Sequence, residues 1–214
     1  MHDIVSRLIT IKKEIQLKNS VAEVIAVSKT FSIKNILPLI NYGHNHFGES
    51  KVQEAVEKWS DIKRDFKNIK LHMVGKLQTN KVKYAVPLFD YIHSLDNIKL
   101  AEKISSEQKK LNKKIKIFIQ VNIGDESQKS GLAPDKLNHF LSICTKELDL
   151  EIIGLMCLPP NNEDSSKYFK EMKKLLLNTQ LSQLSMGMSN DYLEAIDYNS
   201  TFVRIGSKIF GERN

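Results

Sequence analysis

The segment VIAVSKTFSIKNILPLI, residues 24–40, contains the pattern that decides the fold. Its first four residues form a short apolar run rich in β-branched side chains, which is typical of a buried strand. Ile33, Ile36, Leu37 and Ile40 then recur at helical spacing, so the second half predicts an amphipathic helix. A buried strand followed directly by a helix is the unit from which covered parallel sheets are built.

The same alternation continues along the chain and predicts eight strands. They are Val24–Val27, His46–Gly48, Leu71–Val74, Tyr91–Ser94, Ile117–Asn122, Ile152–Met156, Leu181–Met186 and Phe202–Ile205. Eight strands that alternate with helices predict an α/β fold, a single compact (β/α)8 TIM barrel that forms one domain over residues 1–214. An open doubly wound sheet remains the alternative, because alternation alone does not show closure. No GxGxxG motif follows the first strand, which argues against a dinucleotide-binding sheet.

An additional helix is predicted at the start of the chain, before the first strand. Its apolar residues recur on one face and are Ile4, Leu8, Ile11 and Ile15. Side-chain oxygens or a proline mark the starts of several later helices, because they suit the first turn. The predicted starts are Ser32, Ser50, Pro134, Asp164 or Ser165, and Ser189.

The chain is basic, with 32 Lys and Arg against 25 Asp and Glu, a formal charge of +7. This charge raises nucleic acid as a partner. However, only four of the 32 basic residues are arginines, so 28 are lysines, and acids lie between them. Arginine is the usual residue for planar recognition of phosphate and bases. We therefore expect a solvated lysine-rich surface and no nucleic-acid partner.

Other features indicate a cytoplasmic protein. No apolar run approaches the roughly 20 residues of a membrane span, and the first residues lack the pattern of a signal peptide. Cys144 and Cys157 are too far apart for a metal knuckle or a CxxC redox pair, and we expect free thiols. A lone barrel without an additional dimerising domain is expected to be a monomer.

Lys29 directly follows the first predicted strand, at the end where barrel enzymes carry their chemistry. Partial burial there lowers the pKa of a lysine, and a neutral amine is a nucleophile toward aldehydes. One interpretation is therefore a lysine that forms a Schiff base. The alternative is a strand-end lysine that extends its ammonium to water.

Arg204 lies within the otherwise apolar eighth strand and cannot lose its proton. A buried arginine needs partners, so it faces either an anion or ring nitrogen of a ligand, or an acid of the barrel such as Glu49. Two turns follow the seventh and eighth strands, where barrels frequently bind phosphate. The first contains Ser189, and the second is Gly206-Ser207. A reactive lysine, a phosphate cradle and an arginine match the aldehyde, phosphate and ring nitrogen of pyridoxal 5′-phosphate.

Several motifs then occur in the order found in a known family. They are VSKT (27–30), FGE (47–49), HMVG (72–75), LQTNK (77–81), QVN (120–122), GLM (154–156), LSMGMS (184–189), VRIG (203–206) and IFGER (209–213). From about residue 20 onward the chain resembles the pyridoxal phosphate homeostasis protein family. The family's usual FGEN reads FGES here, with Ser50 in place of asparagine.

The resemblance implies a single barrel similar to the N-terminal domain of alanine racemase. It also implies a pyridoxal phosphate-binding protein that buffers or delivers the cofactor, without robust catalysis and with transient contacts to apo-enzymes. By the resemblance, Lys29 holds the cofactor as an internal aldimine. Ser189 contacts the phosphate, Gly206 and Ser207 close the cradle, and Arg204 faces the ring nitrogen.

A weak amino-acid racemase or decarboxylase is the alternative function. Four residues follow Phe210, so we expect no second domain to supply a catalytic tyrosine. A second base would have to come from the barrel. The candidates are His72, His93, Tyr91 and Lys129, which we expect to be mainly structural or surface residues. His44 and His46 lack further ligands for a metal site.

Overall fold

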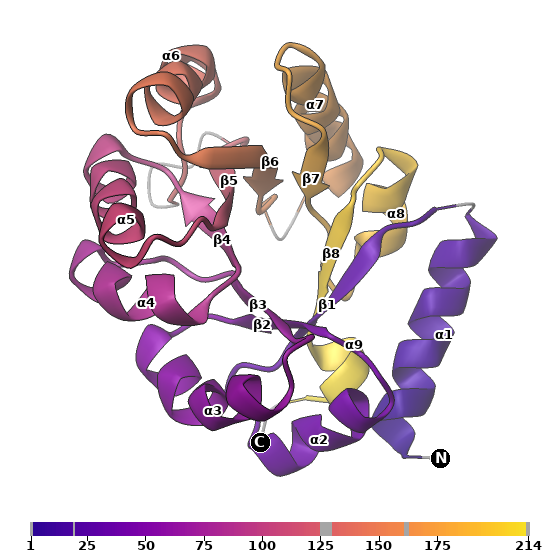
Figure 1. Ribbon diagram of the computed structural model, residues 1–214. Helices are drawn as coiled ribbons and strands as arrows, with labels where there is room; N and C mark the ends of the chain where they lie inside the picture. Colours follow the sequence, from indigo (N-terminus) through magenta and orange to yellow (C-terminus); the bar gives the residue numbers. More distant parts are fainter. Residues whose placement is uncertain (1, 19, 125–129, 161–162, 213–214) are drawn as a thin grey trace.

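The computed structural model describes residues 2–18, 20–124, 130–160 and 163–212. Within them, eight parallel strands close into a barrel in the order β1-β2-β3-β4-β5-β6-β7-β8 (Figure 1). The strands are β1 (Glu23–Val27), β2 (His46–Glu49), β3 (Lys70–Met73), β4 (Tyr91–Leu95), β5 (Lys116–Val121), β6 (Glu151–Cys157), β7 (Gln183–Ser185) and β8 (Phe202–Ile205). The (β/α)8 prediction is confirmed, and the pairing of β1 with β8 excludes the open sheet.

Helices cover the outside of the barrel between successive strands (Figure 1). They are α1 (Asp3–Leu17), α2 (Ile33–Asn41), α3 (Val52–Asp65), α4 (Val82–Leu88), α5 (Ile98–Leu111), α6 (Leu137–Ser142), α7 (Ser165–Leu177), α8 (Tyr192–Asp197) and α9 (Ser207–Phe210). Short 3-10 turns, Thr79–Lys81 and Pro134–Lys136, precede α4 and α6, and a π-helical turn, Ile143–Glu147, follows α6.

The extra N-terminal helix is confirmed as α1, which packs against α2, α8 and α9 beside the barrel. Its predicted apolar face is buried. The helix therefore covers the seam where the first and last strands meet.

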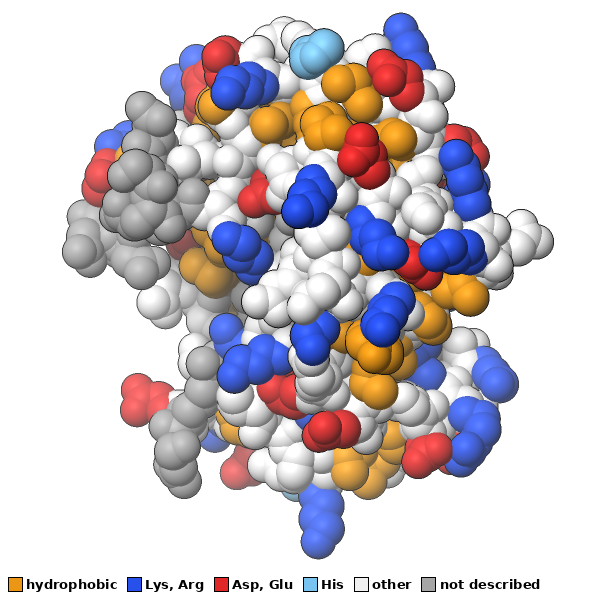
Figure 2. All heavy atoms as spheres, turned by 90° about the vertical axis from the view of Figure 1, so that its left-hand side faces the viewer, with side chains coloured by type: hydrophobic (Ala, Val, Ile, Leu, Met, Phe, Trp, Pro, Cys, Tyr) orange, Lys and Arg blue, Asp and Glu red, His pale blue; other side chains and the backbone are white. Residues whose placement is uncertain are grey.

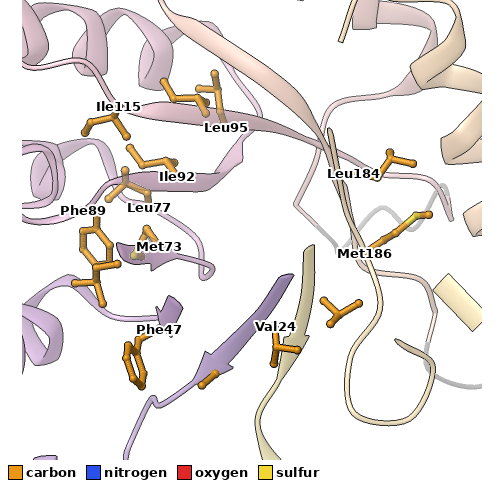
Figure 3. Packing of buried hydrophobic residues seen from close by; sticks show 14 of the residues in the cluster. Val24, Phe47, Met73, Leu77, Phe89, Ile92, Leu95, Ile115, Leu184 and Met186 are labelled. Carbon is orange, nitrogen blue, oxygen red and sulfur yellow. The ribbon is translucent and has the colours of Figure 1, made fainter. Parts of the chain in front are cut away.

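The buried apolar residues form two layers, because successive side chains of a strand point to opposite faces. Val24 and Ala26 of β1 belong to a large cluster that includes helix residues such as Trp59. Ile25 and Val27 belong to a smaller cluster inside the barrel, with Phe118, Met156 and Phe202. Figure 3 shows members of the larger cluster along several strands. The helices thus stabilise the barrel from outside, and the interior carries a second set of side chains.

All eight predicted strands are present. Each observed end lies within two residues of the predicted one. The largest difference is at β7, which begins at Gln183 and not at Leu181. The N–H of Leu181 donates to Thr179 Oγ1 at 3.1 Å, so this backbone belongs to a side-chain turn and not to the sheet.

The helix starts were predicted less well. Ser32, Asp164 and Pro134 occupy the expected positions. Ser50 does not cap α3, whose N-cap is Lys51. The backbone of Ser50 lies against Gly75, where an added Cβ would be 2.4 Å from the Ser50 carbonyl oxygen, and Ser50 forms a bend between β2 and α3.

Lysines are distributed among acidic and apolar side chains on the face seen in Figure 2, which shows no area of a single charge. Within the described residues, every helix is too short or too polar to cross a membrane.

Candidate functional site

The carboxyl ends of the strands meet at one mouth of the barrel, and the predicted site residues come from β1, β7 and β8. Lys29 lies two residues beyond β1, with a half-buried side chain. The β1–β8 pairing sets Ile25 opposite Arg204. A Cβ built on Gly206, just after β8, would be 3.6 Å from the carbonyl oxygen of Val27. Barrel closure therefore brings residues from opposite ends of the chain to the same part of the mouth.

The backbone before Lys29 is held by a buried network. Ser28 Oγ donates to Glu49 Oε1 at 2.7 Å, and Trp59 Nε1 donates to the same oxygen at 2.9 Å. Lys58 Nζ donates at 3.0 Å both to Glu49 Oε1 and to the Ser28 carbonyl oxygen. Glu49 is fully buried, and its Oε2 has no hydrogen-bond partner among the described residues. The strand end that carries Lys29 is thus attached to helix α3.

The backbone after Lys29 is held from two sides. Thr30 has a φ of 71°, and its N–H donates to Glu54 Oε1 at 2.5 Å. Phe31 stacks on Phe210, with ring centroids 4.8 Å apart. Partial burial acts to raise the pKa of Glu54, but hydrogen bonds from Lys58 and the Thr30 N–H outweigh it, so the pKa is lowered. The loop is therefore positioned before any ligand arrives.

Arg204 points into the barrel and is only 5% exposed. Its Nη1 donates to the carbonyl oxygen and to Oγ of Ser185, both at 2.7 Å, and Nη2 donates to the Cys157 carbonyl at 2.8 Å. Burial lowers the pKa of the guanidinium, which stays charged. The alternative of an ion pair with Glu49 is wrong, because Glu49 pairs with Lys58. Described residues thus engage three of the five N–H donors of Arg204.

Ser189 does not open a helix, contrary to the prediction. Helix α8 begins at Tyr192 with Asp191 as its N-cap, and the Asp191 carboxylate accepts the N–H of Met188 at 2.6 Å. The Asp191 side chain makes no cap hydrogen bond to α8, so this carboxylate holds the loop that precedes the helix. Ser189 Oγ instead accepts the N–H of Lys208 at 3.3 Å, which joins the loop after β7 to the turn after β8.

The turn after β8 consists of Gly206 and Ser207 and opens α9. Gly206 is the N-cap, and its carbonyl accepts the N–H of Phe210 at 2.9 Å. Val27 supplies the nearest described atoms to a Cβ added at Gly206, at 3.6 and 3.7 Å, which is ordinary van der Waals contact without a clash. Ser207 is exposed. A ligand group can therefore approach this backbone closely.

The mouth thus combines an amine, two hydroxyls, a turn with an accessible backbone and a guanidinium. A hydroxyl and backbone N–H groups suit a phosphate, and the guanidinium is a permanent donor. A half-buried amine suits a carbonyl carbon.

A row of polar side chains inside the barrel was not predicted from the sequence. His46, His72 and His93 lie on the consecutive strands β2, β3 and β4 and are hydrogen-bonded to one another and to Ser185. His72 and His93 are fully buried. The signal was present, because His72 and His93 interrupt apolar strands and His46 begins another.

The other residues singled out in the sequence are not placed at this mouth of the barrel by the structure. Tyr91 is at the start of β4, at the opposite end of the barrel from Lys29. Lys129 lies outside the described residues. His44 Nε2 contacts the His46 carbonyl oxygen at 2.9 Å, and burial lowers the pKa of His44 to about 3. The described residues contain no group of three His, Cys, Asp or Glu side chains that could hold a metal ion.

Comparison with known sequences matches residues 7–214 to the family model "Alanine racemase, N-terminal domain". The pyridoxal phosphate homeostasis protein of Aquifex aeolicus is 37% identical over 201 residues, which cover 90% of this chain and 87% of the relative.

Solved structures with a similar fold include a member of the same family. PipY of Synechococcus elongatus, solved with pyridoxal phosphate (PLP) bound, has a TM-score of 0.87 and 31% identity over 97% of this chain and 100% of its own. The structure of PipY without PLP has a TM-score of 0.89. Alanine racemase of Clostridium difficile shares the fold at 13% identity, with a TM-score of 0.78 over 99% of this chain and 57% of its own.

Proposed function

This chain belongs to the pyridoxal phosphate homeostasis proteins of the alanine racemase N-terminal domain family, and we propose that it binds pyridoxal 5′-phosphate. In this role it holds the cofactor, and it buffers the cofactor or delivers it to apo-enzymes. When bound, the cofactor supplies an aldehyde that reacts reversibly with amines.

The observation that carries the proposal is the closure of β1 on β8. Closure sets the end of β1, just before Lys29, beside Gly206. Arg204, on β8, and Ser189, which is hydrogen-bonded to the turn after β8, lie at the same mouth of the barrel. We assign Lys29 Nζ as the amine that would hold the aldehyde carbon of the cofactor. Ser189, with the turn Gly206-Ser207, binds the phosphate.

Arg204 faces the ring nitrogen in this arrangement. The guanidinium keeps its protons, so it donates to the nitrogen and leaves it unprotonated. An unprotonated pyridine is a weak electron sink for carbanions. This supports a protein that holds the cofactor without robust catalysis.

The buried histidines also support a non-catalytic role. A racemase or decarboxylase needs groups that exchange protons with a substrate. Both ring nitrogens of His72 and of His93 are already engaged inside the barrel, with partners at 2.9 Å. Neither ring therefore has a nitrogen to offer a substrate.

The test is an absorption spectrum of the protein with added pyridoxal phosphate, before and after borohydride, followed by peptide mapping. We expect a yellow band that reduction removes, with the added mass on Lys29. Lys29→Ala should lose the covalent adduct, and Lys34→Ala, which changes an exposed lysine on α2, should keep it. An adduct at wild-type level in Lys29→Ala would contradict the assignment. Turnover of an L-amino acid that depends on Lys29 would support the racemase or decarboxylase instead.

We further propose that the protein acts as a cytoplasmic monomer. Cys144 and Cys157 are both free and buried, which suits a reducing compartment. Light scattering should give the mass of one chain, 24.5 kDa. Mixing the loaded protein with a pyridoxal phosphate-dependent apo-enzyme should restore the activity of that enzyme.

A further inference from the structure

A chain of hydrogen bonds crosses the interior of the barrel and ends on Arg204. His46 Nδ1 and His72 Nε2 are 2.9 Å apart, as are His72 Nδ1 and His93 Nε2. His93 Nδ1 is 2.9 Å from Ser185 Oγ, which accepts from Arg204 Nη1 at 2.7 Å. The first three members lie on adjacent strands, and the step from β4 to β7 spans the lumen. The chain therefore connects Arg204 to the far side of the barrel.

Aromatic rings hold the two central histidines in place. Tyr91 stacks on His72 with centroids 4.2 Å apart and planes 9° apart, and Phe118 stacks on His93 at 4.4 Å and 18°. Phe202 meets the edge of His93 at 6.3 Å. Burial lowers the pKa of both histidines well below the ordinary value, and for His93 the charge of Arg204 adds to this. Both rings are thus neutral at pH 7, with one proton each.

The hydrogen bonds have one direction that satisfies every buried donor. Arg204 only donates, so Ser185 Oγ accepts from it and still has its own proton to place. Among the described residues, the acceptor in reach of that proton is His93 Nδ1, and a buried hydroxyl proton without an acceptor is costly.

The protons of the histidines follow from this direction. His93 carries its proton on Nε2 and donates to His72 Nδ1. His72 likewise donates from Nε2 to His46 Nδ1. His46 is half-buried. Its Nε2 proton, the last in the chain, can therefore be hydrogen-bonded by solvent.

We propose that His46, His72 and His93 form this one-directional chain and, through Ser185, position Arg204 for the ring nitrogen of the ligand. They are positioning residues, since none is assigned a contact with the ligand. The identity of the ligand rests on the proposed function, whereas the direction of the chain does not.

The first experiment measures the tautomers directly in the ligand-free wild-type protein. Nitrogen-15 NMR distinguishes protonated from unprotonated imidazole nitrogens. We expect His46, His72 and His93 each to be neutral with the proton on Nε2 at pH 7. Protons on Nδ1, or a charged His72 or His93, would overturn the proposal whether or not the protein binds pyridoxal phosphate.

The second experiment compares two variants of His93. In His93→Asn, the side-chain oxygen replaces Nδ1 and still accepts from Ser185, but the contact with His72 is lost. In His93→Gln, the amide replaces Nε2 and keeps the contact with His72, but Ser185 loses its acceptor. A role limited to filling space predicts more damage from asparagine, because it is the smaller side chain. If Ser185 positions Arg204, glutamine should instead damage the ligand site more than asparagine, because Ser185 then loses its acceptor.

We expect His93→Gln to weaken pyridoxal phosphate binding by up to about tenfold, the effect of one lost hydrogen bond between neutral groups. It should also shift the absorption band of the bound ligand and the NMR signals of the Arg204 N–H groups in the ligand-free protein. His93→Asn should keep all three close to wild type, as should His139→Asn, which changes an exposed histidine. Equal effects of asparagine and glutamine at position 93, or a greater effect of asparagine, would overturn the proposal. If neither variant folds, the tautomers of the wild-type protein decide. If wild-type protein binds no pyridoxal phosphate, the proposed function fails, and the tautomers and Arg204 signals still test the chain.

Discussion

Two glycines at the mouth of the barrel differ in what a side chain would meet there. At Gly206 an added Cβ would make ordinary van der Waals contact with Val27, at 3.6 and 3.7 Å. At Gly187 the backbone has a φ of +89°, and the Cβ would be 2.6 Å from Ala195 Cβ. The fold therefore tolerates a methyl group at position 206, whereas it requires glycine at position 187.

Gly206→Ala should therefore reduce ligand affinity without destabilising the protein. The methyl group fits the folded chain, so the free energy of unfolding should stay within about 0.5 kcal/mol of wild type. It occupies the space assigned to the phosphate, so the Kd for pyridoxal phosphate should rise by about tenfold. Urea unfolding and a binding titration measure the two effects. Unchanged affinity would place the phosphate elsewhere.

In contrast to Gly206→Ala, Gly187→Ala should destabilise the folded protein. The positive φ and the close contact with Ala195 should lower the free energy of unfolding by about 3 kcal/mol. A loss below about 0.5 kcal/mol would show that the turn after β7 adjusts freely.

At the scale of elements, helix α3 holds the loop that carries Lys29. Its side chains Glu54, Lys58 and Trp59 contact Thr30, Ser28 and Glu49. The side chain of Lys58 is 10% exposed and that of Glu49 is 0% exposed. Removing one partner of such a pair is strongly destabilising, because it leaves the other charge buried without compensation.

Lys58→Met should leave the Glu49 carboxylate buried without its cation. We expect the free energy of unfolding to fall by about 3–5 kcal/mol in a urea titration. The double variant Glu49→Gln/Lys58→Met removes both charges and should recover part of this loss. If the double variant is less stable than Lys58→Met alone, the charge of Glu49 is not the cause.

At the scale of the whole molecule, the barrel buries several histidines in neutral form. The pKa of His44 is lowered to about 3 by burial and by the charge of Lys12, and burial also lowers the pKa values of His72 and His93 well below the ordinary value. In the unfolded chain these groups titrate near pH 6.5. Between the two values the unfolded state binds more protons than the folded state, so acid favours unfolding.

The free energy of unfolding should thus be highest above about pH 6.5 and fall as the pH is lowered toward 3. Each buried histidine adds a slope of up to about 1.4 kcal/mol per pH unit. His44→Gln should make the profile shallower, and His139→Gln, at an exposed site, should leave it unchanged. Urea titrations at several pH values measure the slopes, and a His44→Gln profile as steep as wild type would contradict this account.

The strand and helix pattern was readable in the sequence, because hydrophobic periodicity reports local structure directly. The alternation from residue 24 onward predicted all eight strands and the helices between them, but not the short helix α9 (Ser207–Phe210) after the last strand. The positions of Lys29 and Arg204 at or next to strand ends followed from the same pattern. Helix starts were less predictable, since Ser50 and Ser189 resemble caps but Lys51 and Asp191 occupy those positions.

The tertiary structure decided what the sequence could not specify, namely which side chains meet. Closure of β1 on β8 brings the start and end of the chain together, and no local pattern encodes a contact over that separation. Whether Arg204 meets Glu49 or Ser185 depends on which face of each strand points into the lumen, and Glu49 contacts α3 instead. The histidine chain likewise exists only because the closed barrel sets β4 across from β7. The sequence by itself therefore determined the elements and the family resemblance, and packing of the closed barrel determined the hydrogen-bond partners.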